Sequence, residues 1–151
     1  MAVCKEMRVT VATAESCTGG MVAARITSVP GSSSVFLGGI VSYANAVKQD
    51  VLGVPQTVLE RKGAVSAECA KAMAKGVRAL LGVDVAVSVT GIAGPGGGTP
   101  EKPVGLVWFG VADGRGTRSE RRVFAGGRAA VRRQAAEQAL ELLLEATRGG
   151  G

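Results

Sequence analysis

The sequence contains no histidine, and this absence removes the most common general base and metal ligand from consideration. A Ser-His-Asp triad is therefore excluded, and a serine nucleophile in this chain would need a lysine as its base. The three cysteines, Cys4, Cys17 and Cys69, are too widely spaced for a Cys-x-x-Cys pair and odd in number for a disulfide framework. Because the acidic residues form no cluster either, we expect no metal site.

Aromatic residues make up only 3% of the 151 residues, so valine, alanine, leucine and isoleucine must fill the core. No apolar run reaches the roughly 18 to 20 residues of a membrane span. The first residues, "MAVCKEMR", are too polar for the apolar centre of a signal peptide. We therefore expect one cytoplasmic domain over residues 1–151, without a membrane partner and with a frayed tail at 148–151.

The chain has a net charge of +6, and much of the excess comes from seven arginines between positions 115 and 133. Such a surface indicates either an anionic partner, such as a phosphorylated metabolite or a nucleic acid, or a solvated face without a ligand. The charge alone supports both interpretations about equally. Because aromatic residues are scarce and no groove-reading motif is present, we expect a small-molecule partner and no nucleic acid.

Hydrophobic periodicity predicts strands alternating with helices, followed by a hairpin and a last helix. The predicted strand at 35–44 is an almost continuous apolar run, which indicates a buried position in the sheet. We expect Asn45 to cap a short helix that Gly53 stops, and Ser66 to cap a longer helix that ends at Gly82. This pattern predicts a single three-layer α/β/α domain with a mixed sheet. The predicted strands are 7–14, 35–44, 83–90, 104–112 and 118–125, and the predicted helices are 17–29, 45–53, 66–82 and one from about 127.

Two strands end at corners made of small residues, and ligands of open α/β sheets bind beyond such strand ends. At the first corner, "ESCTGG", we expect a helix to begin around residues 17–20 and to offer free N–H groups for an anion or an oxyanion. Ser16 is then either a helix cap or a nucleophile, and Cys17 is either a second nucleophile or, more favoured, a buried packing residue. Lys48 is the base available to Ser16, although taken alone it reads as a solvated helix lysine.

The second corner is the glycine-rich stretch "GIAGPGGG" at 91–98. It fails the P-loop pattern because Gly97 stands where a lysine is required, and a strand follows it instead of a helix. A glycine-rich turn whose backbone approaches a ligand closely remains one interpretation, and a simple long connection is the other. Thr90, at the end of the preceding strand, could donate to a ligand or only cap the strand.

The motifs "ATAESCTGG", "GGIVSYANAVKQDVLGV", "GAVS" and "VTGIAGPGGGTPEKPVG" resemble the C-terminal domain of the competence/damage-inducible protein CinA. They also resemble the standalone nicotinamide-nucleotide amidohydrolases called PncC. The resemblance covers nearly the whole chain and implies an α/β/α domain without a metal or organic cofactor. It implies hydrolysis of the carboxamide of nicotinamide mononucleotide to nicotinate mononucleotide and ammonia, which recycles the pyridine ring.

The resemblance also implies roles for individual residues. Ser16 matches the family's nucleophile, while Tyr43 and Lys48 match its tyrosine and lysine, with Lys48 as the base and Tyr43 relaying or orienting the proton. Arg128 in "FAGGR" matches a ligand-binding arginine, and Arg132 is the alternative one turn later. The residues expected to bind the substrate are Thr18, Gly19, Gly20, Thr90, Gly91, Gly94, Gly96, Arg128 and Arg132.

The chain departs from the family at its beginning. Relatives carry a helix before the first strand, and here only "MAVCKEM" precedes it. Without that helix part of one sheet face would be uncovered, so we expect a homo-oligomer, most simply a dimer. The large N-terminal domain of CinA is also absent from the sequence, which predicts the standalone form. A non-catalytic nucleotide-sensing or interaction module linked to competence and DNA damage is the alternative function.

Overall fold

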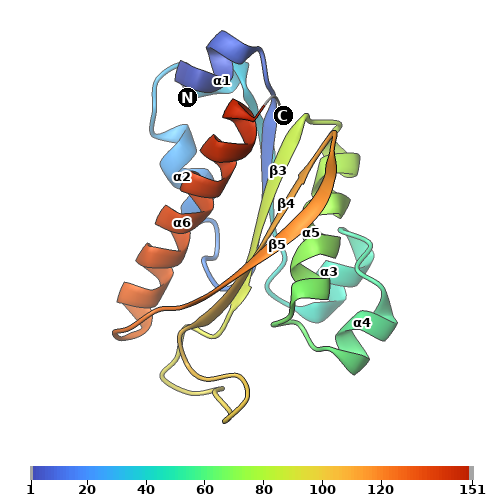
Figure 1. Cartoon of the computed structure of the whole chain (residues 1–151), viewed down its shortest axis with the longest axis vertical. Helices are drawn as coiled ribbons and strands as arrows, with labels where there is room; N and C mark the ends of the chain where they lie inside the picture. Colours follow the sequence, from blue (N-terminus) through green and yellow to red (C-terminus); the bar gives the residue numbers. More distant parts are fainter. Residues whose placement is uncertain (1, 150–151) are drawn as a thin grey trace.

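Among residues 2–149, which the computed structural model describes, five strands form one mixed sheet in the order β2-β1-β3-β4-β5 (Figure 1). β1 pairs in parallel with both β2 and β3, whereas β4 pairs antiparallel with β3 and with β5. The predicted hairpin and the mixed sheet are therefore confirmed. The strands are β1 Val11–Glu15, β2 Phe36–Val41, β3 Val85–Gly91, β4 Leu106–Asp113 and β5 Gly116–Val123.

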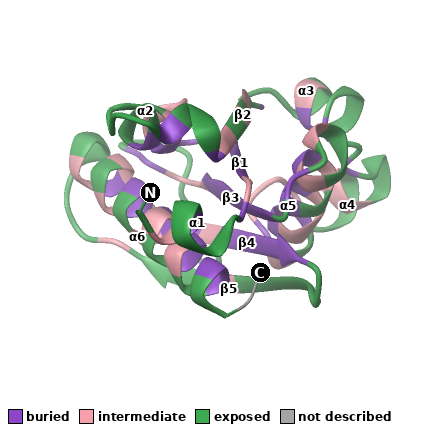
Figure 2. Cartoon of the chain, turned by 90° about the horizontal axis from the view of Figure 1, so that it is seen from above, coloured by how far each residue is buried: buried purple, intermediate pink, exposed green. Residues whose placement is uncertain are grey.

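Helices cover both faces of this sheet, which confirms the three-layer α/β/α architecture. Helices α2 and α6 lie on one face, with α1 packed against α6, and α5 covers the other face, with α3 and α4 beside it (Figures 1 and 2). The helices are α1 Ala2–Met7, α2 Met21–Thr27, α3 Asn45–Asp50, α4 Gln56–Arg61, α5 Ala67–Leu81 and α6 Arg128–Arg148, with a 3₁₀ turn η1 at Ser32–Ser34.

The two faces of the sheet carry side chains of different size because residues alternate along each strand. Valines of β1, β3 and β4 form the core against α2 and α6, whereas alanines of β1 and β3 face α5. The small side chains let α5 sit close to the sheet: the hydroxyl of Ser88 donates to the carbonyl of Ala70 at 2.5 Å. A Cβ on Gly110 would collide with the same carbonyl, so glycine is needed there.

Strand β2 is an edge strand, which corrects the prediction that it is buried. Its residues alternate between half-buried and exposed, and Leu37 and Val41 are 50% and 48% exposed. The apolar sequence alone does not reveal this position, because burial of a strand depends on the order of the sheet.

The helices that follow β1 and β2 begin and end differently from the prediction. Helix α2 begins at Met21 because residues 17–20 form a turn instead. Helix α3 is preceded by Ala44, without a side-chain cap from Asn45, and ends at Asp50 before Gly53. Helix α4 was not predicted. Ser66, by contrast, caps α5 by accepting from the N–H of Cys69, and Gly82 ends that helix, as expected.

The chain does have a helix before β1, so the expected gap at that place is wrong. Helix α1 is only six residues long, but it buries Cys4 against α6, where the thiol lies 3.8 Å from the hydroxyl of Thr147. The uncovered sheet face, which was the reason to expect a dimer, is therefore not found. At the other end α6 continues to Arg148, within the tail predicted to fray, and residues 150–151 of that tail lie outside the described residues. No helix described is both long and apolar enough to cross a bilayer.

Candidate functional site

Ser16 lies immediately beyond the carboxyl end of β1, and its N–H still donates to the carbonyl of Val89 on β3. The chain then turns sharply, and the N–H of Gly19 donates back to the carbonyl of Ser16 at 3.0 Å. Gly19 and Gly20 have φ angles of +60° and +105°, which glycine adopts without strain. The order of the sheet thus places the Ser16 corner beside the strand end that leads into the glycine-rich loop.

Glu15 is a buried carboxylate that caps α2, a role that the sequence analysis missed. It accepts hydrogen bonds from the hydroxyl of Thr18 at 2.6 Å and from the N–H groups of Val22 and Ala23 at 2.9 and 3.1 Å. Because the N–H groups of Val22 and Ala23 are already bound, an anion beside Ser16 would have to use the N–H groups of the turn at residues 17–20 and not those of α2. A charged residue at the end of an apolar strand, just before a helix, was the signal available in the sequence.

Lys48 reaches Ser16 from α3, as predicted, and is 1% exposed. Its Nζ lies 3.0 Å from the Oγ of Ser16, 2.7 Å from the carbonyl of Ser42 and 3.1 Å from the carbonyl of Tyr43. Burial lowers the pKa of Lys48 from its ordinary value. Among the described residues no carboxylate forms an ion pair with it. The surroundings therefore favour a neutral amine, and the solvated-lysine interpretation is wrong.

Tyr43 and Arg128 contact each other at the protein surface. One guanidinium nitrogen of Arg128 donates to the phenol oxygen of Tyr43 at 3.1 Å, and another donates to the carbonyl of Gly94 at 2.8 Å. Tyr43 is 61% exposed, and only its backbone carbonyl contacts Lys48. Arg128, the first residue of α6, therefore links the β2–α3 loop to the glycine-rich loop.

Arg132 has a different environment one turn further along α6. Its guanidinium donates to the carbonyls of Cys17 and Thr18, both at 3.1 Å, and so holds the turn that follows Ser16. A Cβ at Gly19 would lie 3.3 Å from this guanidinium. Arg132 is half-buried and braces the Ser16 turn, whereas Arg128 is exposed.

The other residues expected to bind a substrate are placed as follows. The hydroxyl of Thr90 donates to the carbonyl of Ala64 at 2.9 Å, so it is already engaged within the protein, as is that of Thr18. Gly91 packs against β4, where a Cβ would lie 2.6 Å from the carbonyl of Leu106. A Cβ at Gly96, by contrast, would meet no atom within 4 Å, and the backbone there stays open to a ligand.

The thiols near the site are protonated at neutral pH. Burial raises the pKa of Cys17 and of Cys69 to about 11 in each case. This favours the interpretation of Cys17 as a packing residue over that of a nucleophile. Within residues 2–149 no group of three potential ligands among cysteines and carboxylates is placed to hold a metal ion.

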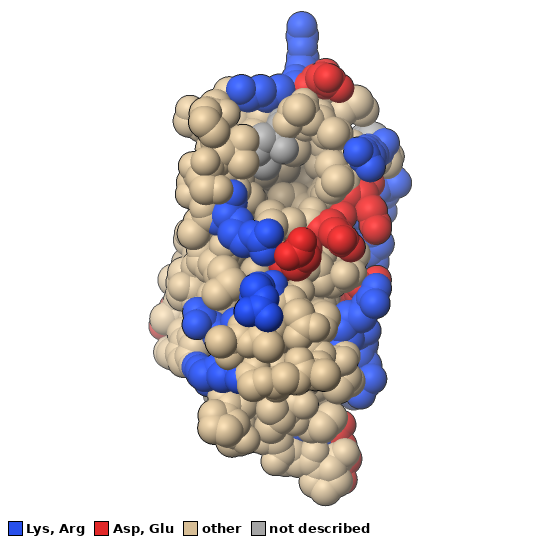
Figure 3. All heavy atoms as spheres, turned by 90° about the vertical axis from the view of Figure 1, so that its left-hand side faces the viewer, with Lys and Arg blue, Asp and Glu red and all other residues tan. Residues whose placement is uncertain are grey.

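The arginine-rich segment does not form a continuous basic surface on the face made by α2 and α6. Figure 3 shows Lys and Arg side chains there interspersed with Asp and Glu. Arg25 of α2 pairs with Glu137 of α6 at 3.3 Å, and both are exposed. Such a mixed surface gives no support to nucleic-acid binding on this face.

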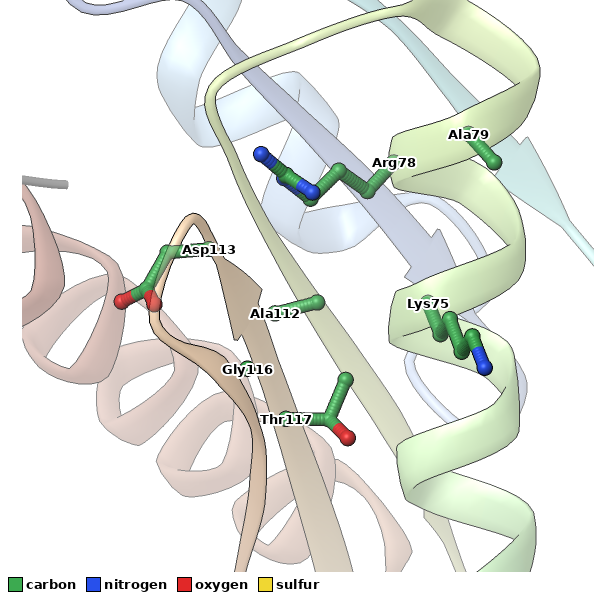
Figure 4. Close-up of a pocket in the computed structure, with 7 residues that line it drawn as sticks. All are labelled: Lys75, Arg78, Ala79, Ala112, Asp113, Gly116 and Thr117. Carbon is green, nitrogen blue, oxygen red and sulfur yellow. The ribbon is translucent and has the colours of Figure 1, made fainter.

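A cavity of about 310 Å³ lies at the other end of the sheet, between α5 and the β4–β5 hairpin. In Figure 4 Lys75 and Arg78 extend from α5 on one side of it, and Thr117 of β5 lies on the other. Asp113 turns toward the loop, where Arg115 and Arg118 hold its carboxylate at 2.9 and 3.1 Å. This cavity contains none of the predicted site residues.

Known proteins resemble this chain over almost its whole length. The model of the CinA C-terminal domain matches residues 1–147. A CinA-like protein of Akkermansia muciniphila is 55% identical over 138 residues, which are 91% of this chain and 33% of that protein. A CinA-like protein of Geotalea uraniireducens is 55% identical over 128 residues, 85% of this chain and 30% of its own length. The chain thus spans about a third of these relatives.

Solved structures agree with this assignment. The competence/damage inducible protein CihA of Agrobacterium tumefaciens superposes with a TM-score of 0.92 at 42% identity, covering 95% of this chain and 88% of that one. A CinA superfamily protein of Klebsiella pneumoniae superposes with a TM-score of 0.93 at 32% identity, covering 98% and 92%. The shared sequence and fold show that this chain belongs to the CinA C-terminal domain family.

Proposed function

We propose that this domain hydrolyses a primary carboxamide, that of nicotinamide mononucleotide, with Ser16 as nucleophile and Lys48 as base. The observation that carries the proposal is the buried contact of 3.0 Å between the Nζ of Lys48 and the Oγ of Ser16. A buried lysine without a carboxylate partner is costly to maintain, and such groups concentrate at functional sites.

The partners of Lys48 fit a neutral amine. A neutral amine has two N–H donors and one lone pair. The carbonyls of Ser42 and Tyr43 take the two donors, so the lone pair is left for the hydroxyl proton of Ser16. In this arrangement the serine proton already points toward its acceptor, as nucleophilic attack requires.

The reaction proceeds in two halves. The Oγ of Ser16 attacks the carboxamide carbon while its proton moves to Lys48, and the C–N bond then breaks as Lys48 returns that proton to the leaving ammonia. Water attacks the resulting ester, with Lys48 again taking the proton, and the acid and free Ser16 are formed. The N–H groups of Cys17, Thr18 and Gly20 donate to no protein oxygen among the described residues, and they are the donors left at this corner for the developing oxyanion.

The contacts of Arg128 support the proposal that the substrate carries a phosphate. Its present acceptors, the phenol of Tyr43 and the carbonyl of Gly94, are both neutral, so a phosphate that replaces them would gain a charge-assisted fork. Tyr43 fits substrate positioning better than proton relay, because its phenol bonds to Arg128 and only its backbone carbonyl contacts Lys48.

The direct test incubates the purified chain with nicotinamide mononucleotide and measures ammonia together with nicotinate mononucleotide. Ser16→Ala is the control for contaminating amidases. Saturable binding of the nucleotide without ammonia release would contradict the enzyme and support the sensing module. We place the reaction in the cytoplasm, in pyridine nucleotide recycling.

A further inference from the structure

Glu15 is a buried ionisable residue to which the proposed reaction gives no part. It is 1% exposed, and among the described residues no lysine or arginine forms an ion pair with it. Burying a charge without a charged partner is costly, so hydrogen bonds must compensate. Three donors bind the carboxylate, namely the hydroxyl of Thr18 and the N–H groups of Val22 and Ala23. A neutral hydroxyl in its place could accept from only two of them.

The turn after Ser16 depends on this carboxylate because its own residues supply no cap for α2. Gly20, the residue before the helix, has a φ of +105° and no side chain that could bond to the first helix amides. The side chain of Glu15 reaches two of these amides from the end of β1, across the turn. The residue that precedes the serine therefore fixes the chain that follows it.

The main chain of Glu15 makes a second connection, on the side of Lys48. Its carbonyl accepts from the N–H of Ser42 at 2.7 Å and from the hydroxyl of Ser42 at 3.3 Å. The carbonyl of Ser42 in turn accepts from the Nζ of Lys48 at 2.7 Å. Ser42 is fully buried, so water does not compete for these bonds. A continuous chain of hydrogen bonds thus leads from Glu15 to the base.

The two connections lead to opposite faces of the sheet. In Figures 1 and 2 α2 lies on the side of α6, whereas α3, which carries Lys48, lies on the side of α5, with β1 and β2 between them. The distance between Ser16 and Lys48 therefore depends on how these two layers are held together. Glu15 bonds to both of them, through its side chain to α2 and through its carbonyl to the segment before α3.

We propose that Glu15 is a positioning residue that fixes the Oγ of Ser16 against the Nζ of Lys48. This inference rests on the proposed reaction at Ser16. Glu15 takes no proton in that reaction and acts only through the turn and through Ser42. Because a displacement of about 1 Å at a reacting group can cost roughly 100-fold in rate, a loosened turn should lower kcat and leave substrate binding nearly unchanged.

Glu15→Gln tests the proposal in the whole chain. The amide has the shape of the carboxylate, but only one of its two ends accepts hydrogen bonds, so at least one donor loses its partner. We expect kcat for ammonia release from nicotinamide mononucleotide to fall about 10- to 100-fold, with KM within about twofold of the wild-type value. Labelling of Ser16 by a fluorophosphonate should slow by a similar factor, because this reaction uses the same Oγ and Nζ but no nucleotide.

Asp113→Asn is the matched control for the loss of a buried carboxylate. Asp113 also accepts several hydrogen bonds, but it lies at the opposite end of the sheet. Both variants should unfold at a lower urea concentration than the wild type. Only Glu15→Gln should lose kcat and labelling rate under conditions where both variants are folded, which separates positioning from general stability.

Thr18→Val is a second variant in case Glu15→Gln does not fold. It removes one donor from the carboxylate and leaves the two amides of α2 in place, so kcat and labelling rate should fall in the same direction but less. Thr147→Val is its control, because Thr147 is a fully buried threonine whose hydroxyl donates to the carbonyl of Leu143 within α6. That variant should keep the wild-type rates.

Wild-type kcat and labelling rate in folded Glu15→Gln would overturn the proposal, as would wild-type rates in Thr18→Val if only that variant folds. Equal losses of kcat in Glu15→Gln and Asp113→Asn would overturn it as well. A wild type that is labelled at Ser16 but releases no ammonia would instead contradict the proposed substrate, and the labelling rates would still decide the role of Glu15. A wild type that is neither labelled nor active would contradict both.

Discussion

Replacing Lys48 with arginine keeps a positive side chain at the base position but removes its ability to give up a proton. The site holds Nζ between two carbonyls and one hydroxyl, and a neutral amine can both donate to the carbonyls and accept from Ser16. A guanidinium is a donor only and stays charged at any working pH. We therefore expect Lys48→Arg to lose roughly three decades of kcat, or about 4 kcal/mol of transition-state stabilisation.

The assay is continuous detection of ammonia from nicotinamide mononucleotide, with Lys75→Arg as the matched control. Lys75 is an exposed lysine on α5 at the cavity far from Ser16, so the same substitution there should leave turnover unchanged. The double variant Ser16→Ala/Lys48→Arg should be no worse than Ser16→Ala alone, because the base has no role once its proton source is gone. Additive losses would show that Lys48 acts through something other than Ser16.

The pH profile adds a second readout. Since burial lowers the pKa of Lys48, the neutral form becomes populated at a lower pH than for a free lysine. Activity should rise with pH through that lowered pKa and then level off, whereas the residual activity of Lys48→Arg should lack this rise. Most of the wild-type turnover retained in Lys48→Arg would refute the reasoning, and so would an unchanged pH profile.

Three further predictions follow from other contacts. Arg128→Ala should raise KM for nicotinamide mononucleotide far more than KM for its riboside. Arg132→Ala, which loosens the Ser16 turn, should instead lower kcat on both substrates. Equal losses on both substrates in Arg128→Ala would show that Arg128 does not bind the phosphate. Burial raises the pKa of Asp113, but hydrogen bonds from Arg115 and Arg118 outweigh burial and bring it to about 2. The carboxylate should therefore contribute about 2 kcal/mol of stability above about pH 4, lost as the pH falls toward 2, and urea melts of Asp113→Asn against wild type should converge over that range. EDTA should leave turnover unchanged, and restoration of an EDTA-abolished activity by a divalent ion would contradict the Ser-Lys chemistry.

The contact between Ser16 and Lys48 could be predicted because the sequence restricts the choices. Without histidine the base of a serine must be a lysine, and the chain after the second strand returns Lys48 to the first corner. The caps of α5 and the start of α6 could be predicted equally well, since Ser66, Gly82 and Gly127 are local signals in the sequence. These features depend on residues within a few positions of one another or on the chemistry of a single site.

Features that depend on the assembled sheet could not be predicted in this way. The apolar run of β2 is the same whether the strand is central or at an edge, and only the order of the sheet decides between them. The start of α2 depends on Glu15, which lies seven and eight residues before the amides it binds. Likewise, the different roles of Arg128 and Arg132 follow from which loops lie opposite each guanidinium, which no spacing along the chain reveals.

The placement of Glu15 fits the proposed role of Lys48 as a base. A carboxylate close to Lys48 would favour its ammonium form and raise its pKa. Glu15 is adjacent to Ser16 in sequence, yet its carboxylate is bound by Thr18 and by the first turn of α2. The side of Ser16 that faces α3 therefore presents Lys48 with carbonyl and hydroxyl groups but no negative charge. The acid stabilises the turn that follows the serine and does not pair with the lysine, as the proposed proton exchange between Ser16 and Lys48 requires.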